Sequence, residues 1–231
     1  MVLPPWELLL KKMLWRQLDY LSGCQILDFG SGYGITANHL AQNNTVTAIE
    51  PDATMLGSAV NDAGYAQIVG GIEKLSDFER HSFDAVVCHN VLEYIPDKAA
   101  VVRSFSRILK PGGTLSLCKH NRNGRIMQMA VLLNNFQHAH ELMDGKGGQS
   151  LQFGEIGYYE DGDAEEWEPA FQLEKAYGVR TFWHLQQNQE IQKDPHWQQE
   201  MLAIEERASE NPDFQRIAFF HHLIYRKQPE L

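Results

Sequence analysis

A glycine-rich turn is the first feature of the sequence that could carry chemistry. Residues 26–34 read ILDFGSGYG, so a short apolar run leads into a turn with glycine at Gly30, Gly32 and Gly34. Glycine tolerates positive φ and lets a ligand approach the backbone closely. A helix that starts just after the turn offers N–H groups without intrahelical partners. The pattern predicts a site for a nucleotide-like ligand; the alternative is only a tight connection between a strand and a helix.

A carboxylate follows at the end of the next apolar run. Glu50 comes directly after residues 45–49 (TVTAI) and twenty positions after Gly30. A carboxylate at the end of a second strand can accept hydrogen bonds from both hydroxyls of a ribose, although it could also be a solvated charge. The dinucleotide fingerprint G-x-G-x-x-G requires glycine at position 35, where this chain has Ile35. The spacing therefore disfavours NAD(P) as the ligand.

These residues need a sheet to position them, and the first half of the chain predicts one. Short apolar, β-rich runs alternate with helical patterns, which is typical of right-handed βαβ units. We expect strands at residues 24–29, 45–49, 66–69, 83–88 and 114–119. Helices are expected within residues 1–22, 35–42, 52–62 and 98–109. The near-continuous apolar character of the strands indicates burial on both faces of a parallel sheet.

The second half of the chain has a different pattern. An apolar helix is expected at residues 126–133, a glycine- and acid-rich loop or lid at 144–169, a strand-like run at 171–184, a helix at 196–209 and a final strand at 216–225. The whole pattern predicts one α/β domain over residues 1–231. Its Rossmann-like, doubly wound sheet would have seven mostly parallel strands with helices on both faces. Residues 123–169 would be an insertion after strand five that acts as a lid or recognises the substrate.

Residues 24–120 resemble the class I S-adenosylmethionine (SAM)-dependent methyltransferases. Residues 28–34 (DFGSGYG) match the pattern E/D-x-G-x-G-x-G, and residues 109–113 (LKPGG) match the turn before strand five. Residues 71–73 (GIE) lie where that family contacts adenine. The resemblance implies SAM as the cofactor, held by Asp28, Gly30, Ser31, Gly32, Gly34, Glu50, Pro51, Met55, Gly71, Ile72, Glu73 and His89.

Other segments are similar to a bacterial subgroup, the tRNA 5-carboxymethoxyuridine methyltransferases. They are residues 89–94 (HNVLEY), 115–117 (LSL) leading to Asn121, 135–136 (NF) and 178–182 (GVRTF). This resemblance implies methylation of a carboxylate on a modified wobble uridine of tRNA. The chain departs from the subgroup in its first helix, where Leu10, Lys11 and Lys12 stand in place of an arginine. It also has an acidic stretch near residues 144–169 instead of a lysine run.

Polar residues at the ends of strands four and five are the candidates for catalysis: His89, Tyr94 and His120. Methyl transfer from a sulfonium releases a neutral group, so an enzyme mostly needs to hold the reactants in line. A carboxylate acceptor needs no general base, whereas a hydroxyl or an amine does.

A basic cluster near residues 119–125 could bind an anionic acceptor, although it could also be a solvated loop. The candidate substrate-binding residues are Asn121, Arg122, Arg125 and Arg180. The acceptor would be tRNA or a small anionic molecule such as a carboxylate or a quinone precursor. The formal net charge of −10 argues against a broad electrostatic grip on nucleic acid.

Composition narrows the class of protein further. No apolar run approaches the roughly 20 residues that span a bilayer, so we expect no membrane segment. The N-terminus has no basic stretch before its apolar residues, which favours the cytoplasm. Three cysteines without a CxxC pair predict neither a disulfide framework nor a metal site. Two rivals remain: an NAD(P)-dependent oxidoreductase and a SAM-binding protein without catalysis.

Overall fold

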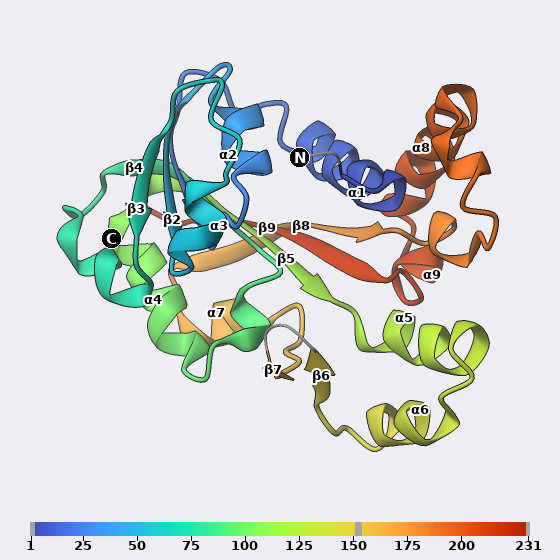
Figure 1. Ribbon diagram of the computed structural model, residues 1–231. Coiled ribbons are helices and arrows are strands. Elements are labelled where there is room, and N and C mark those ends of the chain that lie inside the picture. Colours follow the sequence, from blue (N-terminus) through green and yellow to red (C-terminus); the bar gives the residue numbers. More distant parts are fainter. Residues whose placement is uncertain (1–2, 151–153, 230–231) are drawn as a thin grey trace.

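The computed structural model describes residues 3–150 and 154–229, and its centre is a seven-stranded sheet in the order β3-β2-β1-β4-β5-β9-β8 (Figure 1). The strands are β1 (Gln25–Phe29), β2 (Thr45–Glu50), β3 (Ala66–Val69), β4 (Phe83–His89), β5 (Leu109–His120), β8 (Phe171–Val179) and β9 (Phe220–Lys227). Strands β1 to β5 pair in parallel, and β9 runs antiparallel to β5 and to β8. The predicted Rossmann-like sheet of seven mostly parallel strands is confirmed.

The apolar runs form the middle of this sheet, where each central strand pairs with a neighbouring strand along both of its edges. Ile26 pairs with Val46 of β2 and with Ala85 of β4, and both Ile26 and Ala85 are fully buried. Parallel strands of this kind place their carboxyl ends along one edge of the sheet, where open α/β proteins bind ligands.

Helices cover both faces of the sheet (Figure 1). On one face, α1 (Pro5–Gln17), α2 (Ile35–Leu40) and α8 (Pro195–Ser209) bury their apolar side chains in one cluster that includes Met13, Ala37 and Leu202. On the other face, α4 (Lys98–Ile108) and α7 (Asp163–Trp167) pack in a second cluster through Phe105 and Ala164. The doubly wound arrangement predicted from the alternation of elements is therefore confirmed.

The helix after β2 is shorter than predicted, and two single-turn helices follow later strands. The helix expected at residues 52–62 is α3 (Ala53–Gly57), capped by the side chain of Asp52. It ends early because the backbone N–H of Val60 donates to the carbonyl oxygen of Tyr33, which ties this segment to the glycine-rich turn. Single-turn helices η1 (Ile72–Asp77) and η2 (Leu92–Tyr94) follow β3 and β4.

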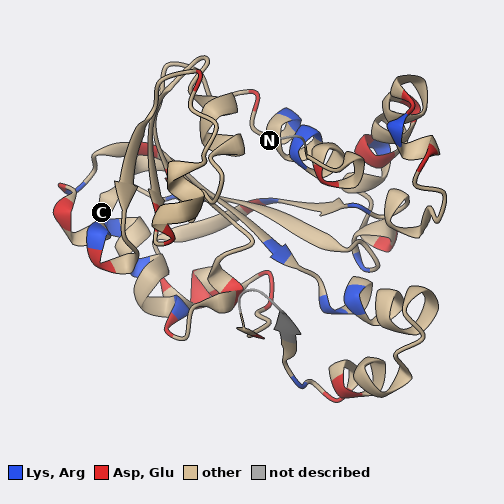
Figure 2. Ribbon diagram, in the orientation of Figure 1, with Lys and Arg blue, Asp and Glu red and all other residues tan. Residues whose placement is uncertain are grey.

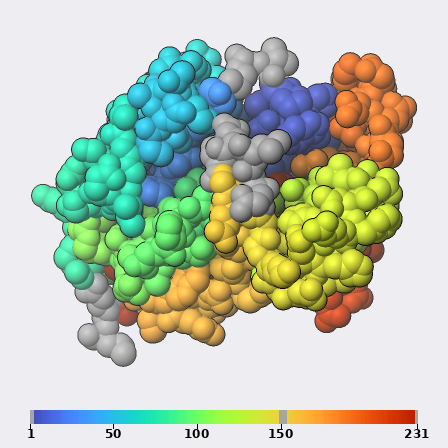
Figure 3. Space-filling view, turned by 60° about the horizontal axis from the view of Figure 1, so that its bottom comes forward, coloured from blue at the N-terminus to red at the C-terminus, as the bar shows by residue number. Residues whose placement is uncertain are grey.

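A helical lobe follows β5. It consists of α5 (Arg122–Met127), the π-helical turn η3 (Gln128–Leu132) and α6 (Phe136–Met143). The apolar helix expected at residues 126–133 is thus present but begins at Arg122. In Figure 3 the lobe, coloured yellow-green to yellow, lies below the blue α1 and the orange α8. A two-stranded sheet of β6 (Gly148–Ser150) and β7 (Gly154–Ile156) comes next.

Part of the glycine- and acid-rich segment, 144–169, packs into the core rather than lying over it. Tyr159 and Ala164 are 5% and 0% exposed and belong to the apolar cluster under α4. The hydroxyl of Tyr225 on β9 donates to the backbone carbonyl of Asp161. The segment after β7 is therefore anchored to the sheet.

The strand-like run at 171–184 is shorter than predicted. β8 ends at Val179 because Arg180 has a φ of +64°, which turns the chain. The turns η4 (Trp183–Leu185) and η5 (Ile191–Lys193) then lead into α8. The final strand begins at Phe220 instead of Arg216, since α9 (Pro212–Gln215) precedes it.

Within the described ranges no helix has both the length and the apolar character needed to cross a bilayer. The same residues contain no group of three His, Cys, Asp or Glu side chains that could hold a metal ion. Cys88 and Cys118 are buried free thiols, and Cys24 is a partly exposed free thiol.

Candidate cofactor and acceptor site

A cavity of about 640 Å³ opens at the carboxyl ends of β1, β2 and β4. This volume is typical of sites for small molecules. Its lining includes nine of the twelve residues predicted for the cofactor: Gly30, Ser31, Gly32, Glu50, Pro51, Met55, Gly71, Ile72 and His89. Tyr94 lines the same cavity. The structure therefore brings together most of the residues that the sequence selected.

The glycine-rich turn needs glycine for two different reasons. At Gly30, with a φ of +74°, an added Cβ would lie 2.3 Å from Cγ2 of Val91, which packs over the turn. At Gly34, with a φ of +70°, it would lie 1.8 Å from the hydroxyl oxygen of Tyr65. Gly30 thus shapes the cavity wall, whereas Gly34 lies outside the cavity lining and allows Tyr65 to pack beneath the turn.

Glu50 holds the turn and the start of α3 together. Its Oε2 accepts a hydrogen bond from the N–H of Gly32 at 2.8 Å, and its Oε1 accepts one from the N–H of Asp52 at 2.9 Å. Each carboxylate oxygen has a second lone pair, so both can still accept a ligand hydroxyl. This geometry fits the pair of hydroxyls on the ribose of SAM.

Asp28 lies under the turn instead of in the cavity lining. Burial raises the pKa of its carboxyl to about 6, although the nearby charge of Lys11 opposes the shift. Its Oδ2 has no hydrogen-bond partner among the described residues. Asp28 is therefore a buried carboxyl beside the cavity and not part of its lining.

Lys11 was not among the residues predicted for the site. It reaches the cavity from α1, where its Nζ donates to Oγ1 of Thr36 at 3.0 Å. The sequence offered only a pair of adjacent lysines on a helix, and the fold selects Lys11. An ammonium group at this position suits the carboxylate of the methionine part of SAM.

Glu73 does not line the cavity, although Gly71 and Ile72 do. Its Oε1 accepts a hydrogen bond from the N–H of Gly71 at 2.8 Å. Backbone hydrogen bonds of this kind lower the pKa of its fully exposed carboxyl. The adenine contact expected from Glu73 therefore has no support from its geometry.

His89 belongs to a chain of buried hydrogen bonds. Its Nε2 lies 2.8 Å from Oγ of Ser116, which lies 2.7 Å from Nε2 of His222, whose Nδ1 lies 2.7 Å from Oε1 of Gln17. Burial, together with the neighbouring His222, holds the pKa of His89 well below its usual range. Burial lowers the pKa of His222 to about 3. Both rings are therefore neutral at pH 7.

His120 lies away from the cofactor cavity. Its Nδ1 contacts Oε1 of the buried Glu93 at 2.7 Å, and its ring packs against Phe219 and Phe220. It lines a smaller cavity of about 200 Å³ together with Asn121 and Arg122.

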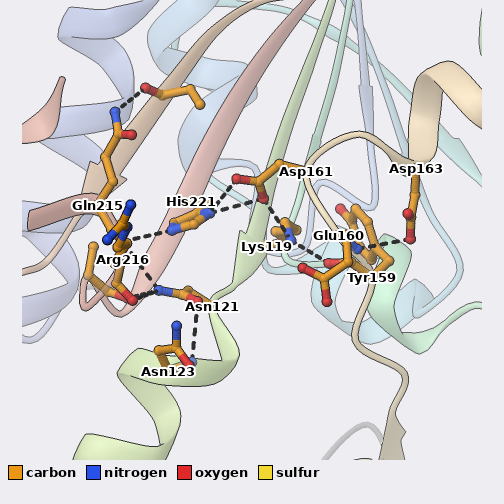
Figure 4. A network of polar contacts seen from close by, with 12 residues as sticks. Lys119, Asn121, Asn123, Tyr159, Glu160, Asp161, Asp163, Gln215, Arg216 and His221 are labelled. Atoms are coloured by element: carbon orange, nitrogen blue, oxygen red, sulfur yellow. Dashed lines mark hydrogen bonds and ion pairs between the residues drawn. The ribbon is translucent and has the colours of Figure 1, made fainter. Parts of the chain in front are cut away.

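Several members of the predicted basic cluster are occupied by contacts within the protein (Figure 4). Asn121 donates through Nδ2 to the carbonyl oxygens of Gln215, Arg216 and Ala218, which holds the start of β9 against β5. Arg122 donates to the carbonyl oxygen of Leu142 at 3.4 Å. These contacts stabilise the lobe and the sheet, and they leave Asn121 little capacity for a substrate.

Lys119 makes the central ion pair of this network (Figure 4). Its Nζ lies 2.8 Å from Oδ1 of Asp161, and His221 contacts the same carboxylate through Nδ1 at 2.8 Å. Although burial opposes it, the contacts with His221 and Lys119 hold the pKa of Asp161 at about 2. The network ties the acid-rich segment to β5 and β9.

Arg125, on α5, and Arg180, after β8, pack against the same aromatic ring, that of Phe219. Figure 2 shows the Lys and Arg positions in blue. The guanidinium carbon of Arg180 lies 5.0 Å from the ring centroids of both Trp6 and Phe219. The guanidinium carbon of Arg125 lies 6.0 Å from the centroid of Phe219. Burial and the charge of Arg125 lower the pKa of Arg180 to about 10.

His184, which the sequence did not single out, packs on the same ring. Its ring is stacked on Phe219 at a centroid distance of 4.3 Å. Burial, with the charges of Arg180 and Arg125, lowers its pKa to about 4.

Comparison with known proteins bears on the class of protein to which this chain is similar. A family described as a methyltransferase domain matches residues 27–117. A ubiquinone biosynthesis O-methyltransferase of Xanthomonas oryzae pv. oryzae (strain PXO99A) is 34% identical over 128 residues, which are 50% of this chain and 54% of that protein. The chain thus spans about half the length of the curated relatives it matches.

Solved structures match over nearly the whole chain and show its fold. A SAM-dependent methyltransferase of Methanosarcina mazei covers 93% of this chain and 98% of its own, with a TM-score of 0.60 and 17% identity. One of Mesorhizobium loti covers 93% and 97%, with a TM-score of 0.59 and 16% identity. The chain therefore shares its fold with SAM-dependent methyltransferases, and residues 27–117 are similar to a methyltransferase domain.

Proposed function

We propose that this chain is an enzyme that transfers the methyl group of SAM to a carboxylate oxygen of its acceptor, and that this acceptor is a modified wobble uridine of tRNA. The observation that carries the choice of a carboxylate is the state of His89. This histidine lines the cofactor cavity, but its low pKa makes it a poor base at neutral pH. A carboxylate is already ionised and needs no base.

The residues of the chain would then act by binding and orientation. Bound SAM supplies a methyl group on a sulfonium, which a nucleophile displaces in line. The turn at Gly30 and Gly32, with Glu50 and Lys11, would hold the donor, and Tyr94 would border the reacting atoms. Holding two reactants in line removes much of the entropic barrier of such a step. The insertion at residues 123–169, which includes most of the helical lobe, would cover the acceptor and exclude water.

The tRNA acceptor is supported by the segments that resemble the tRNA 5-carboxymethoxyuridine methyltransferases. One of these segments, residues 89–94, contributes to the lining of the cavity. Another, residues 178–182, contains Arg180. The Lys and Arg positions at the end of β5 and in α5 follow one another along the ribbon, where Figure 2 shows them in blue. They could attract an anionic acceptor locally despite the net charge of −10.

A second candidate is a small anionic molecule of the quinone-precursor type. It is supported by the 34% identity to a ubiquinone biosynthesis O-methyltransferase over half of this chain. Such an acceptor presents a hydroxyl, which requires a base that His89 does not supply at neutral pH.

Deletion of the gene, followed by mass spectrometry of tRNA nucleosides, tests the first candidate. We expect the methyl ester of the wobble uridine to disappear and to return when the purified protein and SAM are added to tRNA from the deletion strain. Unchanged nucleosides would refute the tRNA acceptor. Transfer of labelled methyl to a small-molecule extract would then favour the second candidate, and SAM binding without any transfer would favour a non-catalytic protein.

A further inference from the structure

Two guanidinium groups share one aromatic ring without an acidic partner. Arg180 and Arg125 lie over Phe219 at 5.0 and 6.0 Å, and Arg180 also lies over Trp6. Within residues 3–150 and 154–229, neither arginine forms an ion pair, and the Nε of each has no hydrogen-bond partner. Nη1 of Arg125 donates to Oε1 of Gln128, and the carboxylates of Glu205 and Glu7 act on Arg180 without forming an ion pair with it.

The fold maintains this arrangement against two unfavourable factors. Burial lowers the pKa of both arginines, which reflects the cost of removing a cation from water. Arg180 also adopts a φ of +64°, which is uncommon for a residue other than glycine. The carboxylate of Glu205 accepts hydrogen bonds from the N–H groups of Thr181, Phe182 and Trp183, so it holds this turn instead of pairing with Arg180.

His184 adds a third unused donor. Its side chain is 9% exposed, and neither ring nitrogen has a hydrogen-bond partner in the described part of the chain. Its lowered pKa keeps the ring neutral at pH 7, so one nitrogen carries a proton that it can donate. Buried donors without acceptors are rare in folded proteins unless a ligand satisfies them.

This cluster lies beside the cofactor cavity, because Arg180 packs over Trp6 and the next residue of α1, Glu7, lines the cavity. Glu7 and Tyr94 both line the cavity. The carboxylate of Glu7 acts on the pKa of Arg180, and Arg125 shares the ring of Phe219 with Arg180, so both arginines lie near this wall of the cavity. An anion held by the cluster would therefore lie beside the methyl donor.

We propose that Arg125, Arg180 and His184 form the subsite that binds the carboxylate of the methyl acceptor; this inference rests on the proposed function. The planar guanidinium fork matches a carboxylate. The enclosure between Trp6 and Phe219 favours a small planar group at the tip of an acceptor over a backbone phosphodiester. One carboxylate oxygen would be held by the cluster. The other would form the new O–CH₃ bond as the S–CH₃ bond breaks and its electron pair stays on sulfur, and no proton moves.

Binding of a small probe tests the subsite without catalysis. The full chain is saturated with S-adenosylhomocysteine and titrated calorimetrically with phenoxyacetate, with the neutral phenoxyacetamide and with inorganic phosphate. We expect phenoxyacetate alone to bind, and at least about tenfold weaker binding in Arg180→Gln and in Arg125→Gln, since each loses a charge-assisted hydrogen bond. Arg103→Gln is the matched control because it removes the same charge from an exposed site on α4.

Thermal unfolding serves as the folding control, and His184→Phe is a further variant if an arginine variant unfolds. Equal affinity of phenoxyacetate for the wild type and the subsite variants would overturn the proposal, as would binding of phosphate in its place. Arginine-dependent binding without methyl transfer to any carboxylate would refute the proposed function and leave the subsite. Methyl transfer to a carboxylate that both glutamine variants retain would refute the subsite alone.

Discussion

Lys11 and Lys12 are neighbours on α1, yet the fold gives them different surroundings. Lys11 lines the cofactor cavity beside Thr36, whereas Lys12 donates to Oε1 of Gln198 on α8 at 3.1 Å. The two residues therefore provide a matched pair for testing whether an ammonium group in the cavity contributes to cofactor binding.

Lys11→Gln should weaken SAM binding at least about tenfold, since one hydrogen bond from a charged group contributes about 1.5–3 kcal/mol. Lys12→Gln should change the dissociation constant less than about twofold. Calorimetric titration of both variants with SAM measures the difference. A similar loss in the two variants would mean that Lys11 has no specific part in binding.

The buried histidines predict how stability depends on pH. Burial lowers the pKa of His222 to about 3, so between pH 6 and 4 the unfolded chain binds a proton there that the folded chain does not. Stability is therefore present above about pH 6.5 and is lost as the pH falls. The contribution of His222 to the slope is about 1.4 kcal/mol per pH unit in that window.

His222→Gln should reduce this slope by about that amount, measured by urea unfolding at pH 6, 5 and 4. His196→Gln is the control because His196 is exposed at the start of α8. An unchanged slope in His222→Gln would show that this ring takes up its proton in the folded protein.

At the level of elements, the β1–α2 turn combines positive φ with close packing. Gly34 and Gly23 have nearly equal φ values, +70° and +68°. An added Cβ at Gly34 would meet the buried Tyr65, whose hydroxyl donates to Val60, whereas an added Cβ at Gly23 would meet nothing within 4 Å. The pair separates the cost of backbone strain from the cost of steric overlap.

Gly23→Ala should therefore lower the free energy of unfolding by about 1 kcal/mol, through strain alone. Gly34→Ala should lower it by about 3 kcal/mol or more, because Tyr65 must also move. Denaturant unfolding of the two variants measures both quantities. Equal losses would mean that Tyr65 adapts without cost.

For the whole molecule, the cofactor cavity predicts that SAM stabilises the folded state and that NADH does not. At a SAM concentration of about 100 times its dissociation constant, the native state gains about 2.7 kcal/mol. For a protein of 231 residues this corresponds to a rise in Tm of roughly 5–10 °C. A thermal shift assay should show this rise with SAM and none with NADH, because position 35 is Ile35 and not glycine. The reverse result would support the oxidoreductase rival.

Much of the cofactor site was predictable because its signals are local in the sequence. The turn at Gly30 and Gly32 and the carboxylate of Glu50 each follow directly after a predicted strand. Carboxyl ends of parallel strands meet at one edge of the sheet, so the alternation of elements alone brings these residues together. Element ends were predicted less well: β8 ends at Val179, and Glu205, from a distant helix, holds the turn that follows.

The sequence by itself determined the sheet and the turn, through periodicity and spacing over short stretches, and its resemblance to SAM-dependent methyltransferases implied the donor. Only the tertiary structure decided which charged side chains are free for a ligand. Asn121 satisfies backbone carbonyls, whereas Arg125, Arg180 and His184 meet around Phe219 without an ion pair among the described residues. These residues come from separate segments, and whether a charge is paired depends on neighbours that the order of strands β5, β9 and β8 brings together.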